Sequence, residues 1–352
     1  MSRFLNGGYG SLKPYVPGEQ PQTSGLVKLN TNESPFPPSP KVIEAISAAE
    51  AEKLNRYPDP EETALIRAAS GACGLPCDMI MAGNGSDELL AFSFMIFQGG
   101  GGKVYFPDIS YGFYKVFAET FGASPRMIAT GDDLMINAED YSGLDGMIVL
   151  ANPNAPTGAA ISRADVEKIL KTNGDNLVLI DEAYVNFGAE SSLQLTLEYD
   201  NLLVIQTFSK DRNLAGARIG LAFGDKEIIG DLKKIKYSFN PYNLNRLSIL
   251  AGVAAINDKE YYEICLGKIK KTRKEFVKNM EGMGFSVIPS FANFVFARHD
   301  KISGADYYRE LRRKNILVRH FDDARIDDYV RITIGKDEEM EALIAATKQI
   351  LF

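Results

Sequence analysis

The sequence predicts an α/β fold: a large domain with a mostly parallel central sheet flanked by helices, then a smaller α+β domain. Short apolar runs alternate with amphipathic segments from about residue 80 to residue 223, which is typical of parallel strands joined by helices. Beyond Pro241 this alternation gives way to a helical stretch rich in Lys and Glu. The 352 residues also exceed what one core normally organises. We therefore expect an N-terminal arm over 1–30, a large domain over 31–241 and a small C-terminal domain over 242–352.

The large domain is expected to contain buried strands at five apolar runs. These runs cover 79–82, 103–106, 147–150, 177–180 and 202–206. Ahead of them, the Pro-dense segment 34–40 marks the entry to a helix that should begin near Lys41. Residues 1–30 are rich in Gly, Pro and Gln and should form an extended arm.

The smaller domain is expected to open with the helical stretch, which covers 243–280. Strand-like runs follow at 285–288 and 294–297, and a helix is expected over 305–314. Short strands near Val318 and Arg331 and a closing helix from Lys336 complete the pattern. The sequence contains no internal repeat or low-complexity tract.

Composition excludes several classes of function. The net charge of −7 and the absence of a Lys/Arg run give no signal for nucleic-acid binding. Three cysteines form no disulfide framework, and only two histidines leave little to complete a metal site, so we expect reduced thiols in a cytoplasmic protein without a metal. There is no uninterrupted 18-residue apolar run and no apolar signal core at the start, so no membrane association is expected.

The segment 207–220 carries the most chemical information. It follows the apolar run 202–206, so a buried strand should deliver Ser209 and Lys210 to its C-terminal end, where ligands bind in open α/β sheets. A lysine there can form a Schiff base with an aldehyde, and Ser209 and Arg218 can donate to an anion. This chemistry requires the pKa of Lys210 to fall from about 10.4 towards ~7–8 through burial and a cation such as Arg218. The plainer alternative is that Lys210 and Arg212 are solvated loop charges.

A second strand end adds an acid and a phenol. The run 177–180 leads into Asp181, and Tyr184 follows three residues later. An isolated carboxylate is costly to bury, and the protonated pyridine nitrogen of pyridoxal phosphate (PLP) would offset that cost. The cofactor then becomes an electron sink for a carbanion at Cα, and Tyr184 could donate to its phenolic oxygen. The alternative is a helix-capping acid beside a half-buried tyrosine.

Two further features fit a cofactor with a phosphate and a flat ring. The loop 83–88 allows a tight turn at Gly85, and Ser86 or Asp87 then begins a helix whose free N–H groups favour an anion. Taken alone, the loop also fits an ordinary capped helix start. Tyr111 follows the run 103–106 and could stack on the ring, or it could be an ordinary core aromatic.

With these residues assembled, the chain resembles a fold-type I PLP-dependent aminotransferase over nearly its full length. Within that superfamily it most resembles the histidinol-phosphate aminotransferases. The lysine, aspartate and arginine motifs mark the superfamily, while a Lys-Pro-Tyr and an Arg-Tyr-Pro element narrow the resemblance. The matching segments are 12–15, 29–35, 56–59, 83–88, 152–158, 181–184, 209–220 and 330–335.

The resemblance implies a role for each of these positions. Lys210 is implied as the Schiff-base lysine, with Asp181 on the pyridine nitrogen and Tyr184 on the phenolic oxygen as the other catalytic residues. The large PLP-binding domain would also place Tyr111 on the ring face. The implied phosphate contacts are Gly85, Ser86, Asp87 through its backbone, Ser209, Arg218 and, more weakly, Thr207.

The resemblance also implies a homodimer with shared active sites. Tyr57 would reach the phosphate of the neighbouring subunit's cofactor and border its substrate. Arg331 would hold the anionic group of the substrate. Arg319, Tyr15 and Tyr242 are implied as further substrate contacts.

Two departures from the family pattern affect the expected site. Relatives usually have Asn immediately before Pro-Thr-Gly, where it donates to the phenolic oxygen, but this chain has Ala155. That contact is either lost or passes to Asn154, a candidate cofactor residue, or to Asn152. The chain also has Asp211, Arg212 and Asn213 where many relatives have small or apolar residues, so we expect a charged pair to line that wall.

The function that these residues imply is transamination between L-histidinol phosphate and 2-oxoglutarate in histidine biosynthesis, with Lys210 moving a proton from Cα to C4′. Rivals within the fold are an aromatic aminotransferase and a threonine-phosphate decarboxylase. The decarboxylase often carries His-Gly-Gly near its start, where this chain has Asn6-Gly7-Gly8. A rival of another class is a non-catalytic PLP-sensing domain, but residues 1–30 are too short and too rich in Gly and Pro for the DNA-binding module that normally precedes one.

Overall fold

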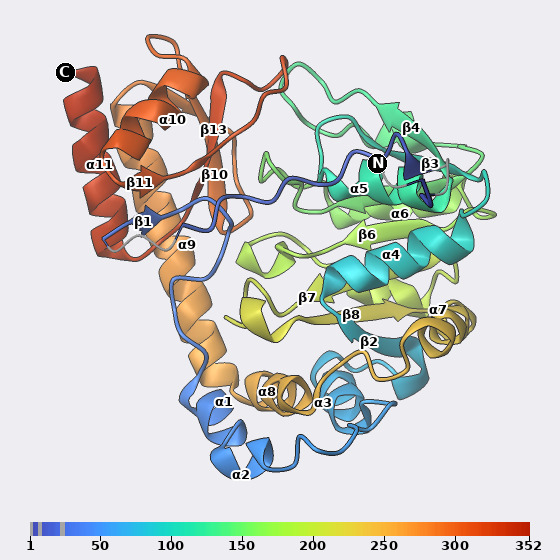
Figure 1. The fold of residues 1–352 in the computed structure, drawn as a ribbon. Coiled ribbons are helices and arrows are strands. Elements are labelled where there is room, and N and C mark those ends of the chain that lie inside the picture. The colour runs from blue at the N-terminus through green and yellow to red at the C-terminus, as the bar shows by residue number, and fades with distance from the viewer. Residues whose placement is uncertain (1–2, 6–8, 22–24) are drawn as a thin grey trace.

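Two domains lie beside each other in the computed structural model, which describes residues 3–5, 9–21 and 25–352 (Figure 1). Asn6, Gly7 and Gly8, which bear on the decarboxylase alternative, lie outside the described residues. The larger domain is built on a seven-stranded sheet and the smaller on a four-stranded antiparallel sheet. The predicted α/β fold with a second α+β domain is confirmed. Among the described residues, every helix is too short or too polar to span a bilayer.

The large sheet has the strand order β2-β8-β7-β6-β5-β3-β4, and β8 alone among these strands runs in the opposite direction to the others. Five strands coincide with the predicted apolar runs, and each central strand is buried because helices cover both faces. The edge strand β4 could not be found as an apolar run because it is polar and partly exposed. The strands are β2 (Ile80–Asn84), β3 (Lys103–Pro107), β4 (Ser124–Ile128), β5 (Met147–Ala151), β6 (Val178–Asp181), β7 (Leu202–Thr207) and β8 (Ile219–Gly224).

Alternate residues of the central strands enter two separate cores, one on each face of the sheet. On β5, Ile148 and Leu150 face one core while Met147 and Val149 face the other. The first core is covered by α1 (Pro40–Ala45), α3 (Thr63–Cys73), α6 (Arg163–Thr172) and α8 (Arg246–Asn257). The second is covered by α4 (Ser86–Phe97), α5 (Phe113–Phe121) and α7 (Lys226–Phe239). The short helix α2 (Ala48–Ala51) follows α1.

The helical stretch predicted over 243–280 is two helices, α8 and α9 (Lys259–Gly282), because the backbone leaves the helical conformation at Asp258. The Asn245 side chain caps the start of α8 by accepting a hydrogen bond from the Ser248 N–H at 2.9 Å. Helix α8 packs into the large-domain core, whereas α9 runs on to the smaller domain (Figure 1). The predicted boundary at residue 242 therefore lies ahead of α8, although α8 packs against the large domain.

The smaller domain joins its antiparallel sheet to helices near the predicted positions. The sheet has the order β12-β13-β10-β9, and β11 pairs instead with β1, the end of the predicted arm. Leu29 enters the core of this domain, so the arm is anchored there. The elements are β1 (Val27–Lys28), β9 (Phe285–Val287), β10 (Phe294–His299), α10 (Gly304–Arg313), β11 (Ile316–Leu317), β12 (Arg319–His320), β13 (Tyr329–Thr333) and α11 (Asp337–Leu351).

Residues 9–21 of the arm cross the face between the two domains (Figure 1). Tyr15 stacks on Phe113 of the large domain with ring centroids 4.2 Å apart. Glu19 forms an ion pair with Arg312 of the small domain at 3.0 Å. The arm therefore closes over the junction from which the candidate site opens.

Candidate active site

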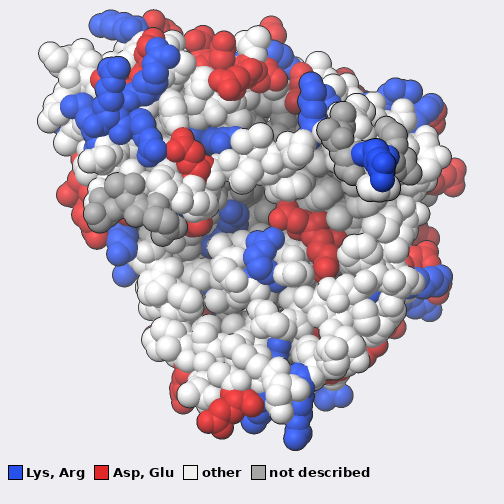
Figure 2. Space-filling view, viewed as in Figure 1, with Lys and Arg blue, Asp and Glu red and all other residues white. Residues whose placement is uncertain are grey.

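A cavity of about 490 Å³ lies at the C-terminal ends of β6 and β7, between the large domain and β12 and β13 of the small domain. Figure 2 shows a hollow near the middle of one face, bordered by both basic and acidic side chains. The volume is in the usual range for small-molecule sites. It brings together most of the residues marked in the sequence: Tyr15, Ser86, Asp87, Tyr111, Asp181, Tyr184, Thr207, Ser209, Lys210, Arg218, Arg319 and Arg331.

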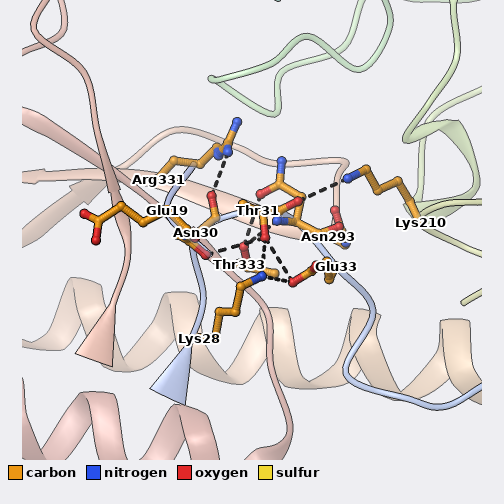
Figure 3. Close-up of polar contacts among 10 residues, drawn as sticks. Glu19, Lys28, Asn30, Thr31, Glu33, Lys210, Asn293, Arg331 and Thr333 are labelled. Carbon is orange, nitrogen blue, oxygen red and sulfur yellow. Dashed lines mark hydrogen bonds and ion pairs between the residues drawn. The ribbon is translucent and has the colours of Figure 1, made fainter. Parts of the chain in front are cut away.

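Lys210 follows β7, as the sequence predicts, and its amine enters the cavity. Its Nζ donates to the backbone carbonyl of Thr31 at 3.1 Å (Figure 3). The same atom lies 5.9 Å from the centroid of the Tyr184 ring. Burial lowers the pKa of Lys210 to about 8, and the positive charges of Arg331 and, less strongly, Arg218 act in the same direction. The contribution expected of Arg218 is present, and Arg331, which the sequence did not suggest for this role, has the larger effect. About a tenth of this amine is therefore unprotonated at pH 7, far more than for a lysine with the ordinary pKa of about 10.4.

Asp181 ends β6 and is 5% exposed. The Tyr114 hydroxyl donates to its Oδ2 at 2.9 Å, and the Ala183 N–H donates to its Oδ1 at 3.1 Å. Burial raises the pKa of Asp181 to about 6, although both hydrogen bonds oppose this rise. A cation placed beside this carboxylate would lower its pKa again, which is what a pyridinium nitrogen does.

The start of α4, Arg218 and the end of β7 converge as donors for an anion. Gly85 turns the chain with φ +80° directly beneath Arg218, and a Cβ at Gly85 would lie 2.5 Å from the Arg218 Nη2. Gly220 allows equally close contact, because a Cβ there would lie 2.6 Å from the Ser86 nitrogen. Ser86 begins α4, so its N–H groups and helix dipole face the same place. Because these two glycines have no Cβ, the Arg218 guanidinium and the first residues of α4 can lie close together.

The remaining groups near this anion site are a hydroxyl pair and an aromatic ring. The Thr207 hydroxyl donates to the Ser209 hydroxyl at 3.0 Å. Arg218 Nη2 forms an ion pair with Asp87 Oδ2 at 3.0 Å, and the Tyr111 hydroxyl donates to Asp87 Oδ1 at 2.9 Å. Asp87 thus holds the guanidinium and the tyrosine ring in fixed positions at the cavity wall.

Two arginines of the small domain are placed where they could form a second anion site. Arg319 of β12 lies directly opposite Arg331 of β13 in the antiparallel sheet. Arg331 Nη2 donates to the Asn30 carbonyl at 3.0 Å (Figure 3). Its guanidinium lies 5.4 Å and 5.5 Å from the Phe294 and Phe321 rings. Its buried Nε has no partner within the described residues. A guanidinium held in this way, with an unused donor, suits a bidentate anion.

Sequence reasoning missed the roles of residues 30–32, although this segment carried part of the resemblance. The Asn30 carbonyl accepts from Arg331, the Thr31 carbonyl accepts from Lys210, and the Asn32 amide donates to the Tyr184 hydroxyl at 3.0 Å. Their partners lie 152 to 301 residues away in sequence, so no local pattern identifies them. Tyr114 was missed for the same reason.

Asn152 and Asn154 do not line the cavity, whereas Ala155 does. The Asn154 side chain donates to the Ile109 carbonyl and accepts from Ser110, both at 2.8 Å. The Asn152 side chain bonds both backbone groups of Ile161 at 3.1 Å. Both amides are thus engaged in holding loops, and neither is directed to the cavity wall.

The expectation that a charged pair, Asp211 and Arg212, lines the cavity is wrong. Asp211 accepts hydrogen bonds from the Asn186 amide at 2.6 Å and the Tyr262 hydroxyl at 3.0 Å. The Arg212 guanidinium lies 3.9 Å from the centroid of the Tyr262 ring. Both side chains line a separate hollow, where these contacts hold Asp211 through its Oδ2 and Arg212 through the Tyr262 ring.

Tyr57 and Tyr242 also lie outside the cavity of the single chain. Their rings stack with centroids 4.4 Å apart, and Tyr57 is 79% exposed. A large aromatic ring that is held in place yet open to solvent is available for contact with another molecule.

Comparison with known proteins agrees with this geometry. Residues 24–346 match the family described as aminotransferase class I and II. Histidinol-phosphate aminotransferase of Marinomonas sp. is 48% identical, covering 99% of this chain and 100% of that protein, and that of Brachyspira hyodysenteriae is 46% identical, covering 100% and 99%. The solved structure of histidinol-phosphate aminotransferase from Sinorhizobium meliloti in complex with pyridoxal-5′-phosphate matches with a TM-score of 0.83 at 25% identity, covering 92% of this chain and 90% of that one. The chain therefore belongs to the class I and II aminotransferase family.

Proposed function

We propose that this protein is a PLP-dependent histidinol-phosphate aminotransferase, which moves an amino group between L-histidinol phosphate and 2-oxoglutarate in histidine biosynthesis. The observation that carries the proposal is identity of 46% and 48%, over essentially the full length of both chains, with relatives of that name. The cavity supports it because an amine, a buried carboxylate and two separate anion sites line one space.

The residues of the cavity fit PLP. The donors around Arg218 suit its phosphate, the Tyr111 ring suits the face of its ring, and the buried Asp181 suits a pyridinium nitrogen. When bound, PLP supplies a carbon that links to amines and a ring that withdraws electrons from the donor's Cα. Lys210, whose pKa is about 8, would supply the amine that holds PLP. Once the donor's amine has displaced it, the freed amine of Lys210 would remove the proton from Cα.

The second anion site explains how two different substrates use one cavity. Arg331 and Arg319 are placed to hold the phosphate of histidinol phosphate in one half-reaction and a carboxylate of 2-oxoglutarate or glutamate in the other. Tyr15 of the arm also lines the cavity, so it limits the access of water. These contacts position the donor so that its Cα faces Lys210.

The proposal includes a homodimer with shared active sites. The exposed Tyr57 ring, held against Tyr242 and outside its own cavity, supports it because such a ring is free to enter a neighbouring site. A cytoplasmic location is supported by the three cysteines, all of which are unpaired.

A panel of amino donors tests the substrate. We expect the PLP-loaded protein to change its visible spectrum fastest with L-histidinol phosphate and to recover it with 2-oxoglutarate. A faster reaction with phenylalanine or tyrosine would instead indicate an aromatic aminotransferase, and release of carbon dioxide from threonine phosphate would indicate a decarboxylase. A spectrum unchanged by every amine would indicate a sensor.

A further inference from the structure

Asn32, Thr333 and Tyr184 form a chain of hydrogen bonds that ends in the cavity. The Asn32 N–H donates to Thr333 Oγ1 at 3.0 Å, and Thr333 Oγ1 donates to Asn32 Oδ1 at 3.2 Å. Asn32 Nδ2 then donates to the Tyr184 hydroxyl at 3.0 Å. A backbone N–H can only donate, so the hydroxyl hydrogen of Thr333 remains for Oδ1 and fixes which way the Asn32 amide faces.

This chain determines the direction of the Tyr184 hydroxyl. Because Tyr184 accepts from Asn32, its single hydrogen must point elsewhere. Among the described residues, no side chain or carbonyl accepts that hydrogen, and Tyr184 lines the cavity. The hydrogen is therefore available to an oxygen atom of a ligand bound there.

The residues that form this chain of hydrogen bonds are held in fixed positions. Asn32 is 1% exposed and Thr333 is 3% exposed, so water does not compete for these hydrogen bonds. Asn32 has φ +55°, a left-handed conformation that Asn tolerates better than most residues. The Asn293 amide donates to the Asn32 carbonyl at 3.0 Å and so fixes its backbone (Figure 3).

We propose that Asn32 and Thr333 are positioning residues that direct the Tyr184 hydroxyl to donate to the phenolic oxygen of PLP. The inference rests on the proposed function. Thr333 lies two residues after Arg331 on β13, so both side chains lie on one face of that strand. Strand β13, which carries Arg331 for the substrate's anion, would thus also orient the Tyr184 hydroxyl towards the cofactor. With Ala155 at the wall, this contact does not depend on an asparagine there.

The other groups near Tyr184 leave it able to donate. Burial raises the pKa of Tyr184 above its ordinary value, while Arg331 and the hydrogen bond from Asn32 limit that rise. The hydroxyl is therefore protonated at neutral pH. The charged groups that face it are Arg331 of β13, Asp181 of β6, Asp87 of α4 and Lys210 after β7.

The test measures the pH midpoint of the visible absorbance change in the PLP-loaded protein. A donor on the phenolic oxygen draws negative charge away from the neighbouring nitrogen of Lys210, so the proton there is lost at lower pH. Tyr184→Phe should therefore raise the midpoint by about one unit, the effect of a single hydrogen bond. Asn32→Asp should raise it similarly, because the carboxylate accepts and turns the Tyr184 hydroxyl towards itself. Asn32→Gly, which tolerates the left-handed backbone, should give a smaller rise.

A double variant separates positioning from the added charge. If Asn32 acts through Tyr184, Asn32→Asp should produce little further shift in the Tyr184→Phe background. An equal shift in both backgrounds overturns the proposal, because the new carboxylate would then act directly. Thr333→Val should raise the midpoint as Asn32→Gly does, whereas Thr333→Ser, which keeps the hydroxyl, should restore it.

Thr347→Val is the matched control. Its hydroxyl also contacts a buried tyrosine of the small domain, Tyr307, at 2.6 Å, but it lies outside the cavity. We expect no shift from this variant, and a shift as large as that of Thr333→Val overturns the proposal. A normal visible band that none of the Asn32 or Thr333 variants shifts overturns the positioning role alone. Failure of the wild-type protein to form a visible band with PLP overturns the proposed function and the inference with it.

Discussion

The Lys210 amine donates to the backbone carbonyl of Thr31 at 3.1 Å, although the two residues are 179 positions apart. Thr31 follows β1 of the small domain, whereas Lys210 follows β7 of the large one. The contact therefore fixes the position of the amine relative to both domains. Arg331, whose charge lowers the pKa of Lys210, donates a hydrogen bond to the carbonyl of Asn30, the residue before Thr31. The reactivity of the lysine thus depends on how the two domains meet.

The first prediction concerns the pH dependence of PLP attachment. Only the unprotonated amine of Lys210 can attack, so attachment to the apoprotein should accelerate as pH rises and level off above about 8. Arg331→Met removes a charge that lowers this pKa, so its midpoint should lie at higher pH. Stopped-flow absorbance measures both. Lys210→Ala should show no covalent attachment after borohydride reduction; attachment to another lysine would refute the assignment.

Asp181→Asn should bind PLP yet lose about 10²–10³-fold in kcat, because the amide cannot hold the pyridine nitrogen protonated. Steady-state rates and equilibrium binding of PLP measure the two effects separately. Glu182→Gln is the matched control, since Glu182 is buried beside Asp181 but bonds Ser191 and Ser192 outside the cavity. Glu182→Gln should lower the melting temperature of the protein but leave kcat nearly unchanged. Near-normal kcat in Asp181→Asn would leave the acid with a purely structural role.

Shared sites predict complementation between two defective variants. If Tyr57 enters the neighbouring site, hybrids of Tyr57→Phe with Lys210→Ala contain one site with both defects and one with neither. Such mixtures should be more active than the sum of the separate variants, once subunits have exchanged. Activity that never exceeds that sum, or a monomer by sedimentation, would count against sharing.

The sequence identified those groups whose position follows from one strand end. Lys210 and Asp181 could be predicted because an apolar run ends immediately before each of them. Asn32 and Tyr114 could not, because each acts on a residue brought near only by the complete fold. Asp211 shows the opposite error. It adjoins Lys210 in sequence, but its side-chain direction is set by Tyr262 on α9, which no local pattern shows.

The sequence predicted a helical stretch over 243–280 without its interruption, for a related physical reason. Asn257 and Asp258 lie within an otherwise helical composition, and the break at Asp258 is visible only as a backbone conformation. There α8 ends against the large-domain core and α9 begins its course to the small domain. Amphipathic periodicity predicts that a helix forms, but the domain against which the helix packs determines the residue at which it ends.

Arg331 should determine substrate preference through the fixed planar arrangement of its guanidinium donors. The guanidinium is fixed between Phe294 and Phe321 and donates to the Asn30 carbonyl, so its remaining donors have a defined direction. Arg331→Lys keeps the charge but loses the bidentate geometry. We expect kcat/KM for histidinol phosphate and for glutamate to fall by roughly 10–100-fold, which corresponds to the loss of ~1.5–3 kcal/mol in a charged hydrogen bond.

Histidinol, which lacks the phosphate, separates recognition from structure in this variant. If Arg331 binds the anion, the rate with histidinol should change little, because no contact to the missing group exists to be lost. If Arg331 only ties β13 to the segment at Asn30, both donors should suffer alike and the melting temperature should fall. Arg325→Lys is a suitable comparison, since Arg325 also joins the domains, through Asp108 and Thr130, but does not line the cavity. Equal losses for histidinol and histidinol phosphate in Arg331→Lys would therefore assign Arg331 to the domain junction and leave Arg319 as the candidate for the substrate's anion.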